Sequence, residues 1–211
     1  MRPSCYEEVI HFTIHQELLC IVLCQLNEFQ ENDFLLDAER LEYSTIRHER
    51  RKKEFAVVRK MKHKYFPNEA ILYAPSGKPY LEKSCENIGI SHTKQHALFA
   101  FSKALFGCDI EEKDDRLLRI EDKYTTPEEC SILLPFDSVD QHCMLWTCKE
   151  AIYKLIGVAG IHWKEQCRLV EVHFPVMKFE LSLNNQVSKI DCYVQERFNN
   201  AWISIAYLAH E

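Results

Sequence analysis

The sequence lacks the features that mark a membrane-spanning or secreted chain. Its most apolar early stretch, HQELLCIVLCQL, is much shorter than the ~20 apolar residues that a helix needs to cross a bilayer. The start, MRPSCYEEV, has no basic segment followed by an apolar run and a small-residue cleavage site, so it does not resemble a signal peptide. We therefore expect a cytoplasmic protein with no membrane contact.

Close cysteine pairs are also missing, although the chain has 10 cysteines. No two of them form a CxxC pair, which a structural zinc site usually needs. Without a secretory signal, a disulfide framework is not expected either. We expect most of these cysteines to be small, reduced and buried.

An overall positive charge is absent, because the formal net charge is -6. This balance argues against a nucleic-acid-binding protein. The charges are nevertheless segregated: residues 47–64 hold nine Lys and Arg against two Glu, and residues 109–122 hold seven acids against three bases. The first block could bind an anion and the second a cation, or each could be a solvated face.

The 211 residues are 46% hydrophobic and 27% charged, which is typical of a globular protein with a sizeable core. Patterning predicts helices at 16–29, 37–64, 113–123, 127–134 and 141–156, the last closed by Gly157. Strands are predicted at 7–15, 87–91, 96–103, 106–111, 168–174, 177–183, 189–198 and 201–210, with Asn pairs at 184–185 and 199–200 forming hairpin turns.

The order of strand, helices and strands thus occurs twice, without any repeated sequence. This order predicts an α+β fold of two halves of similar size, residues 1–102 and 103–211. Since no low-complexity linker separates them, we expect the halves to pack tightly.

Two short segments carry candidate chemistry. In GCDIEE, Asp109 and Glu111 lie two apart on a predicted strand, so their carboxylates share a face and repel each other unless a cation lies between them. Mg²⁺ prefers such oxygen ligands. In LWTCKEAIYK, Trp146, Glu150 and Lys154 recur every four residues along one line of a predicted helix. Glu150 could be a third ligand and Lys154 a phosphate-binding cation. Alternatively, the strand has only a polar edge, the helix only a surface ion pair, and Trp146 only packs in the core.

The two segments together resemble the 4′-phosphopantetheinyl transferase superfamily. Its members have a (V/I)G(I/V)D(I/L)E strand followed by a W(S/T)xKEAxxK helix, and GCDIEE and LWTCKEAIYK match both patterns at the right separation. Cys108 replaces the usual aliphatic residue, at a position that should face away from the metal. RRKKEFAVVR, GKP, ISH and YTTPEE are similar to segments of the larger, surfactin-synthetase-activating type. The resemblance covers residues 40–157 in the family's order.

The resemblance implies a monomer of two similar α+β halves related by a pseudo-twofold axis, with the active site at their interface. Members of the family transfer the phosphopantetheine arm of coenzyme A to a serine of an apo acyl or peptidyl carrier protein and release adenosine 3′,5′-bisphosphate. The implied ligands of Mg²⁺, or of Mn²⁺ in its place, are Asp109, Glu111 and Glu150. Glu150 would also accept the serine proton, directly or through water, and Lys154 would stabilise a phosphate.

By the same resemblance, the first half contributes the residues that bind coenzyme A. His92 would donate a hydrogen bond to a phosphate oxygen, and Ser91 would touch the nucleotide. Lys78 and Pro79 would line the adenine end. Lys78 would also lie near the 3′-phosphate, where the basic helix is expected to supply further cations. Arg51 and Arg59 are the chosen residues of that helix, and Arg47, Lys52 and Lys53 are the alternatives. A basic segment in an acidic protein is consistent with so anionic a substrate.

Other implied roles are less sharply placed. Lys149 could assist Lys154 or lie on the surface. An acid near the metal corresponds to Glu129 or, one residue earlier, to Glu128. We expect the carrier protein to dock on the helices of residues 113–134, with contributions from Arg116, Leu117 and Arg119.

Three other functions stay open at this point. The same acids would serve another Mg²⁺-dependent enzyme that transfers phosphoryl or nucleotidyl groups. A catalytically degenerate member would bind coenzyme A or a carrier without transfer. A plain interaction domain would bind neither metal nor coenzyme A.

Overall fold

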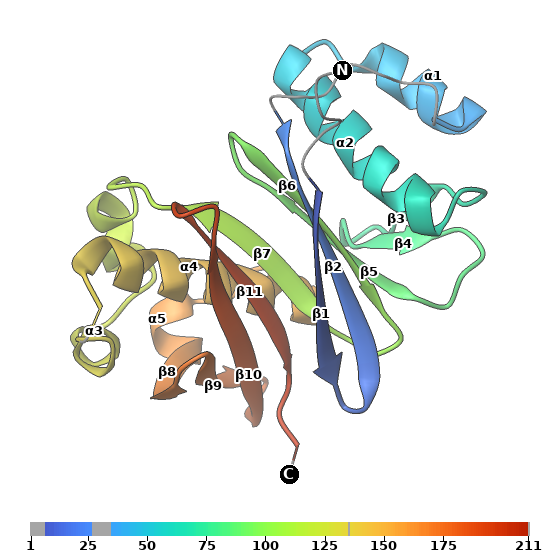
Figure 1. Cartoon of the computed structure of the whole chain (residues 1–211). Coiled ribbons are helices and arrows are strands. Elements are labelled where there is room, and N and C mark those ends of the chain that lie inside the picture. The colour runs from blue at the N-terminus through green and yellow to red at the C-terminus, as the bar shows by residue number, and fades with distance from the viewer. Residues whose placement is uncertain (1–6, 27–34, 135, 211) are drawn as a thin grey trace. The chain divides into compact units, whose positions relative to one another are not determined.

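Two antiparallel sheets and their helices make up the computed structural model, which describes residues 7–26, 35–134 and 136–210 (Figure 1). The chain divides into two units, Met1–Ala104 and Leu105–Glu211. The predicted α+β class is confirmed. The functional roles given to residues 1–102 and 103–211, and the pseudo-twofold relation between the halves, stay predictions.

Among its described residues, the first unit has a six-stranded sheet with strand order β1-β2-β6-β5-β4-β3 and two α-helices. Its elements are β1 (Glu7–Ile14), β2 (Glu17–Gln25), α1 (Asp37–Thr45), α2 (Glu49–Tyr65), β3 (Ile71–Tyr73), β4 (Pro79–Leu81), β5 (Asn87–His92) and β6 (His96–Ser102). Val57, Val58 and Met61 of α2 pack against inward-facing residues of the sheet such as Val22 and Phe99, and these apolar contacts form the core of the unit.

The helix predicted at residues 16–29 is wrong, because Glu17–Gln25 is the strand β2. This strand lies between β1 and β6 and is buried on both faces from Leu19 to Cys24. A strand buried on both faces is apolar throughout, so its sequence shows no alternation and can be mistaken for a buried helix. His15 and Gln16 form the turn before it with positive φ angles of 51° and 69°, without the glycine that would mark such a turn. Residues 27–29 of the predicted helix lie outside the described residues.

The single helix predicted at residues 37–64 is interrupted, and α1 and α2 are separated by Ile46–His48. Just before the break, the hydroxyls of Ser44 and Thr45 donate to the carbonyl oxygens of Leu41 and Glu42, at 2.6 Å and 2.7 Å. Such local bonds compete with regular helical geometry, which accounts for the end of α1.

The second unit is a five-stranded sheet with strand order β7-β11-β10-β9-β8. Its elements are β7 (Gly107–Glu112), the 3₁₀ helix η2 (Leu118–Lys123), α3 (Pro127–Ile132), α4 (Ser138–Ile156), α5 (Trp163–Gln166), β8 (Cys167–His173), β9 (Val176–Leu183), β10 (Gln186–Arg197) and β11 (Ala201–Leu208). Helix α4 packs on β7 and β11, and its apolar face joins the inner face of the sheet in one core.

The predictions for this unit agree well with the structure. Helix α4 begins after Asp137, whose carboxylate accepts from the backbone N–H groups of Val139 and Asp140, and ends at Gly157 in the left-handed region. Residues 113–123, predicted as a helix, contain only the short 3₁₀ helix η2. The second hairpin turn also differs: its positive-φ residues are Phe198 and Asn199 rather than the Asn pair 199–200.

The cysteines are mostly small buried side chains, as expected. Among the described residues, eight cysteines carry no disulfide, and six of these are buried. Cys24, however, is disulfide-bonded, which the argument from the absent secretory signal did not anticipate. Within the same described ranges, no helix is long and apolar enough to span a membrane.

At Gly107, β7 lies very close to the backbone of α4. A Cβ atom at this position would collide with the carbonyl oxygen of Ala151 and would lie 2.5 Å from the backbone nitrogen of Leu155. Both groups belong to the backbone of α4 and cannot rotate away. Only glycine therefore allows the strand to lie this close to the helix.

The variant Gly107→Ala is expected to lower the free energy of unfolding by about 2–3 kcal/mol, because helix and strand must separate to admit the methyl group. Urea denaturation measures this change. Gly160→Ala is the matched control in the same unit, since no atom lies within 4 Å of its added Cβ and only the strain of a φ of 82° remains. Equal losses in the two variants would contradict the proposed close contact.

Candidate active site

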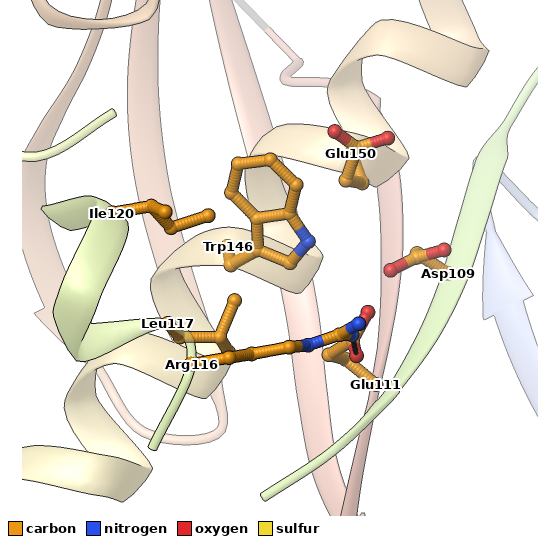
Figure 2. A pocket seen from close by; sticks show the side chains of 7 residues that line it. All are labelled: Asp109, Glu111, Arg116, Leu117, Ile120, Trp146 and Glu150. Atoms are coloured by element: carbon orange, nitrogen blue, oxygen red, sulfur yellow. Dashed lines mark hydrogen bonds and ion pairs between the residues drawn. The ribbon is translucent and has the colours of Figure 1, made fainter. Parts of the chain in front are cut away.

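A cavity of about 370 Å³ lies in the second unit, on the side of β7 that faces α4 (Figure 2). The residues that line it are Asp109, Glu111, Arg116, Leu117, Ile120, Trp146 and Glu150. All three carboxylates predicted from the sequence as metal ligands are among them, together with an aromatic ring and an arginine. Acids far apart in the chain thus share one cavity.

The packing of β7 on α4 brings these side chains together. Asp109 and Glu111 are two residues apart on the strand and therefore point to the same side, toward the helix. Trp146 and Glu150 are one turn apart on α4 and face the strand. Trp146 is partly buried and its ring contacts that of Tyr124 at 5.0 Å, so it packs in the core and also forms one wall of the cavity.

Asp109 is buried, and both of its carboxylate oxygens have partners on α4. Lys154 Nζ donates to Oδ1 at 2.7 Å, and the hydroxyl of Thr147 donates to Oδ2 at 3.0 Å. Lys154 therefore reaches the cavity's acids from one turn beyond Glu150, although it does not line the cavity itself. The contribution of Thr147 was not foreseen, because a threonine inside an apolar helix gives no sequence signal of such a contact.

The negative charge of Glu111 is only partly compensated. The pKa of Glu111 is raised to about 7, mainly by burial; the charge of Arg116 opposes this rise and the charge of Asp109 adds to it. The pKa of Glu150 is also raised, mainly by burial and then by the charge of Asp109, against the effect of Lys154. For Lys154, burial lowers the pKa, but the charge of Asp109 and the hydrogen bond to it raise it overall. The cavity is therefore rich in carboxylate charge that a cation would stabilise.

A comparison with known proteins gives a direct result for this unit. Residues 105–206 match the family model of the 4′-phosphopantetheinyl transferase superfamily. This match supports the superfamily and, in general terms, phosphopantetheinyl transfer. It covers almost all of the second unit and includes every residue that lines the cavity. No curated protein matches the chain.

The carboxylates of this cavity do not form a closed metal cluster. Within residues 7–26, 35–134 and 136–210, no group of three or more His, Cys, Asp or Glu side chains is close enough to hold an ion. The donor set nevertheless suits Mg²⁺, because it consists of carboxylate oxygens from two rigid elements and leaves room for water and substrate oxygens. Glu111 and Glu150 fit this role, because burial raises the pKa of each carboxyl group and a bound cation would stabilise its charged form.

The two other acids considered for this domain have different environments. Glu129 is buried and Glu128 is exposed. Neither lines the cavity in the part of the chain that the structure describes. Glu129 accepts hydrogen bonds from the backbone of Thr126 and Leu169, so it joins the start of α3 to β8.

Lys149 is completely buried, so the alternative of a surface position is wrong. Its ammonium group lies 2.8 Å from Glu129 Oε1 and donates to the carbonyl oxygen of Tyr124 at 2.5 Å. Lys149 thus connects α4 to α3 and to the segment before it. It fixes the rotation of the helix that carries Glu150 and does not itself reach the cavity.

In the first unit, Arg51 and His92 meet although they are 41 positions apart in the sequence. Arg51 Nη1 lies 3.1 Å from His92 Nε2, and both side chains lie within 3.5 Å of the buried carboxylate of Glu54. Arg51 is well exposed and His92 is partly exposed. Two of the residues predicted to bind phosphate are therefore neighbours on one surface of this unit.

The other predicted coenzyme A residues are less exposed. Arg59 is 3% exposed, packs its guanidinium 3.7 Å from the centre of the Phe55 ring, and lies near Glu39 and Glu42. Lys78 and Pro79 are partly buried beside the turn before β4, and burial lowers the pKa of Lys78. Ser91 is 7% exposed. The roles of all these residues stay predictions.

Breaking the buried pair of Lys149 and Glu129 is expected to be costly. Lys149→Met keeps the length of the side chain but leaves the carboxylate of Glu129 buried without its cation, which should lower the free energy of unfolding by about 3–5 kcal/mol. Thermal or urea denaturation measures the loss. Lys164→Met, at an exposed position on α5, is the control and should change stability by less than about 0.5 kcal/mol. A small loss for Lys149→Met would show that the pair does not hold α4.

The charge of Glu111 should make the metal-free protein less stable at high pH. The pKa is about 7 in the folded protein, above its ordinary value of 4.5, so folding is increasingly opposed as the pH rises from about 4.5 to about 7. Glu111→Gln removes this effect and also the ion pair with Arg116, which offsets part of the gain. We expect the variant to be about 1 kcal/mol more stable than the natural protein at pH 8 in EDTA.

This advantage should disappear as the pH falls toward 4.5, where Glu111 is protonated in the folded protein. Denaturation at several pH values measures it. Glu180→Gln, at an exposed position of β9, controls for loss of a carboxylate and should show no such pH dependence. A Glu111→Gln variant that is less stable at pH 8 would contradict the predicted accumulation of negative charge.

Proposed function

We propose that this chain transfers the 4′-phosphopantetheine arm of coenzyme A to a serine hydroxyl of an apo acyl or peptidyl carrier protein. The observation that carries the proposal is a single cavity lined by Asp109, Glu111 and Glu150 in a domain that matches the superfamily. The proposal includes the surfactin-synthetase-activating type, a monomeric state, and the pseudo-twofold relation of the halves with an active site at their interface. All of these follow from the sequence resemblance.

The reaction forms a bond between the serine oxygen and the phosphorus of the phosphopantetheine arm. The bond from that phosphorus to the oxygen of the leaving group breaks, and adenosine 3′,5′-bisphosphate departs. Asp109, Glu111 and Glu150 would hold Mg²⁺, or Mn²⁺ in its place. The bound cation would neutralise the negative charge on the pyrophosphate oxygens.

The chain's own residues have separate tasks in this proposal. Glu150 accepts the serine proton, a role for which a raised pKa is favourable because it brings the carboxylate closer to the operating pH. Lys154 is held by Asp109 next to the acids, so its positive charge lies near any phosphate bound there. Thr147 fixes the second oxygen of Asp109 and thereby the orientation of that carboxylate.

In the first unit, we propose that Arg51 and His92 bind phosphate oxygens of coenzyme A. The pair is supported by its exposure and by the 3.1 Å contact between the two side chains. Glu54 lies beneath both and holds them on one surface. Arg59, Lys78, Pro79 and Ser91 remain proposed contacts of the nucleotide on the basis of the sequence alone.

The transfer is tested with an apo carrier protein, coenzyme A and Mg²⁺, followed by mass spectrometry of the carrier. We expect a mass gain of one phosphopantetheine arm, which EDTA abolishes. Glu150→Ala should reduce the rate at least ~100-fold, because it removes a metal ligand and the proton acceptor together. Glu165→Ala, at an exposed position on α5, should have the natural rate.

The alternatives give other results in the same experiment. Binding of coenzyme A without a mass gain on any of several carriers would indicate a non-catalytic member. Hydrolysis of coenzyme A without a modified carrier would indicate a different phosphoryl-transfer enzyme. Either result would contradict the proposed transfer.

A further inference from the structure

Arg116 has a contact that the proposed chemistry does not use. Its guanidinium lies at the cavity and pairs with the carboxylate oxygen Oε1 of Glu111, as Figure 2 shows. Sequence reasoning placed Arg116 only on the surface where a carrier protein would dock. The structure places its positive charge on a carboxylate that is proposed to hold a metal ion.

Asp109 and Glu111 are both paired with side-chain cations in this structure. Lys154 holds Asp109 and Arg116 holds Glu111, so the three carboxylates of the cavity are opposed by two positive charges. A divalent ion that enters the cavity would be attracted by the acids and repelled by these cations. At least one of the two pairs must weaken for the carboxylates to bind an ion at full strength.

Arg116 is the cation that can leave at the lower cost. Its side chain is 52% exposed, and it lies in the irregular segment between β7 and η2. The backbone N–H of Arg116 donates to Asp114 at 2.9 Å, which holds the main chain, and the side-chain Nε lies 3.7 Å from the carboxylate of Asp114, a residue that does not line the cavity. Lys154 is 32% exposed and belongs to the long helix α4. Moving a more exposed arginine out of the cavity removes little buried contact and restores its hydration.

We propose that Arg116 is a displaceable counter-ion of the metal site: it pairs with Glu111 when no divalent ion is bound and swings away when an ion binds. The inference rests on the proposed function, because it assumes a metal ion between the acids. It adds a positioning residue that sets metal affinity and so links occupation of the site to release of a guanidinium at the mouth of the cavity. A released arginine would then be available to an anionic group of the substrate or the carrier.

The test measures binding of Mn²⁺ alone, without coenzyme A or a carrier. Free Mn²⁺ is counted by electron paramagnetic resonance as it is titrated into the natural protein and into Arg116→Gln. Removing the competing charge should tighten binding about fivefold, the size expected for an exposed ion pair. Glu150→Ala is included to show that the ion binds at the cavity, and it should weaken binding in both backgrounds.

The matched control is Arg119→Gln. Arg119 is exposed on η2, three residues from Arg116, and forms no ion pair among the described residues. Arg119→Gln removes the same formal charge as Arg116→Gln, so it corrects for the general effect of net charge. It should change the affinity for Mn²⁺ less than twofold, because solvent and salt screen the charge of Arg119. Tighter binding in Arg116→Gln than in Arg119→Gln supports the proposal.

Each of the other possible results would contradict the proposed role of Arg116. Equal affinities in the two arginine variants would show that only net charge matters. Weaker binding in Arg116→Gln would show that Arg116 orders Glu111 for the ion instead of competing with it. Mn²⁺ that binds neither the natural protein nor Arg116→Gln would refute the inference, while the carrier assay decides separately whether transfer occurs.

Discussion

The close contact between β7 and α4 is the constraint on which the candidate site depends. Glycine at position 107 lets the strand lie against the backbone of Ala151 and Leu155, and no larger residue could do so. Asp109, two residues after Gly107, faces the helix, and Glu111 follows two residues later on the same side of the strand. One turn of α4 lies between Trp146 and Glu150 on the opposite wall. A fixed spacing between two regular elements therefore sets the position of every acid in the cavity.

The charges in this cavity lower the stability of the fold and favour binding of a cation. Carboxylates in a partly buried space cost free energy while they are ionised, as the raised pKa values of Glu111 and Glu150 reflect. Lys154 and Arg116 reduce this cost without removing it. A site of this kind is prepared for a cation and for anionic oxygens around it. The same preparation makes the metal-free domain less stable than it would be with neutral residues.

Support for α4, the helix that carries Glu150, comes from residues outside the cavity. Lys149 is the neighbour of Glu150 and points into the core, where Glu129 and the carbonyl of Tyr124 hold it. Glu129 in turn binds the backbone of β8 through Leu169. Because a buried ion pair tolerates little displacement, this network fixes the rotation of α4 about its axis. The motif KEA thus combines a buried anchor, Lys149, and an acid that lines the cavity, Glu150, in adjacent positions.

Local sequence was sufficient for the elements that have a clear period or a clear end. Alternating strands of the second unit, the helix that stops at Gly157, and the placement of Asp109 and Glu111 on one face of a strand all follow from side-chain geometry over a few residues. The resemblance to a transferase superfamily rested on two such local segments and agrees with the match to residues 105–206. The strand β2 was mistaken for a helix because an uninterrupted apolar run has no period.

Tertiary structure alone decided which charges meet. The sequence could not show that Arg116 would pair with Glu111, that Lys154 would bind Asp109, or that Lys149 would be buried with Glu129. Arg51 and His92 likewise meet only because α2 and β5 pack in the same unit. The physical reason is that the partner of a charged side chain depends on long-range packing and on burial. Burial sets the cost of leaving a charge unpaired. Spacing along the chain specifies neither the packing nor the burial.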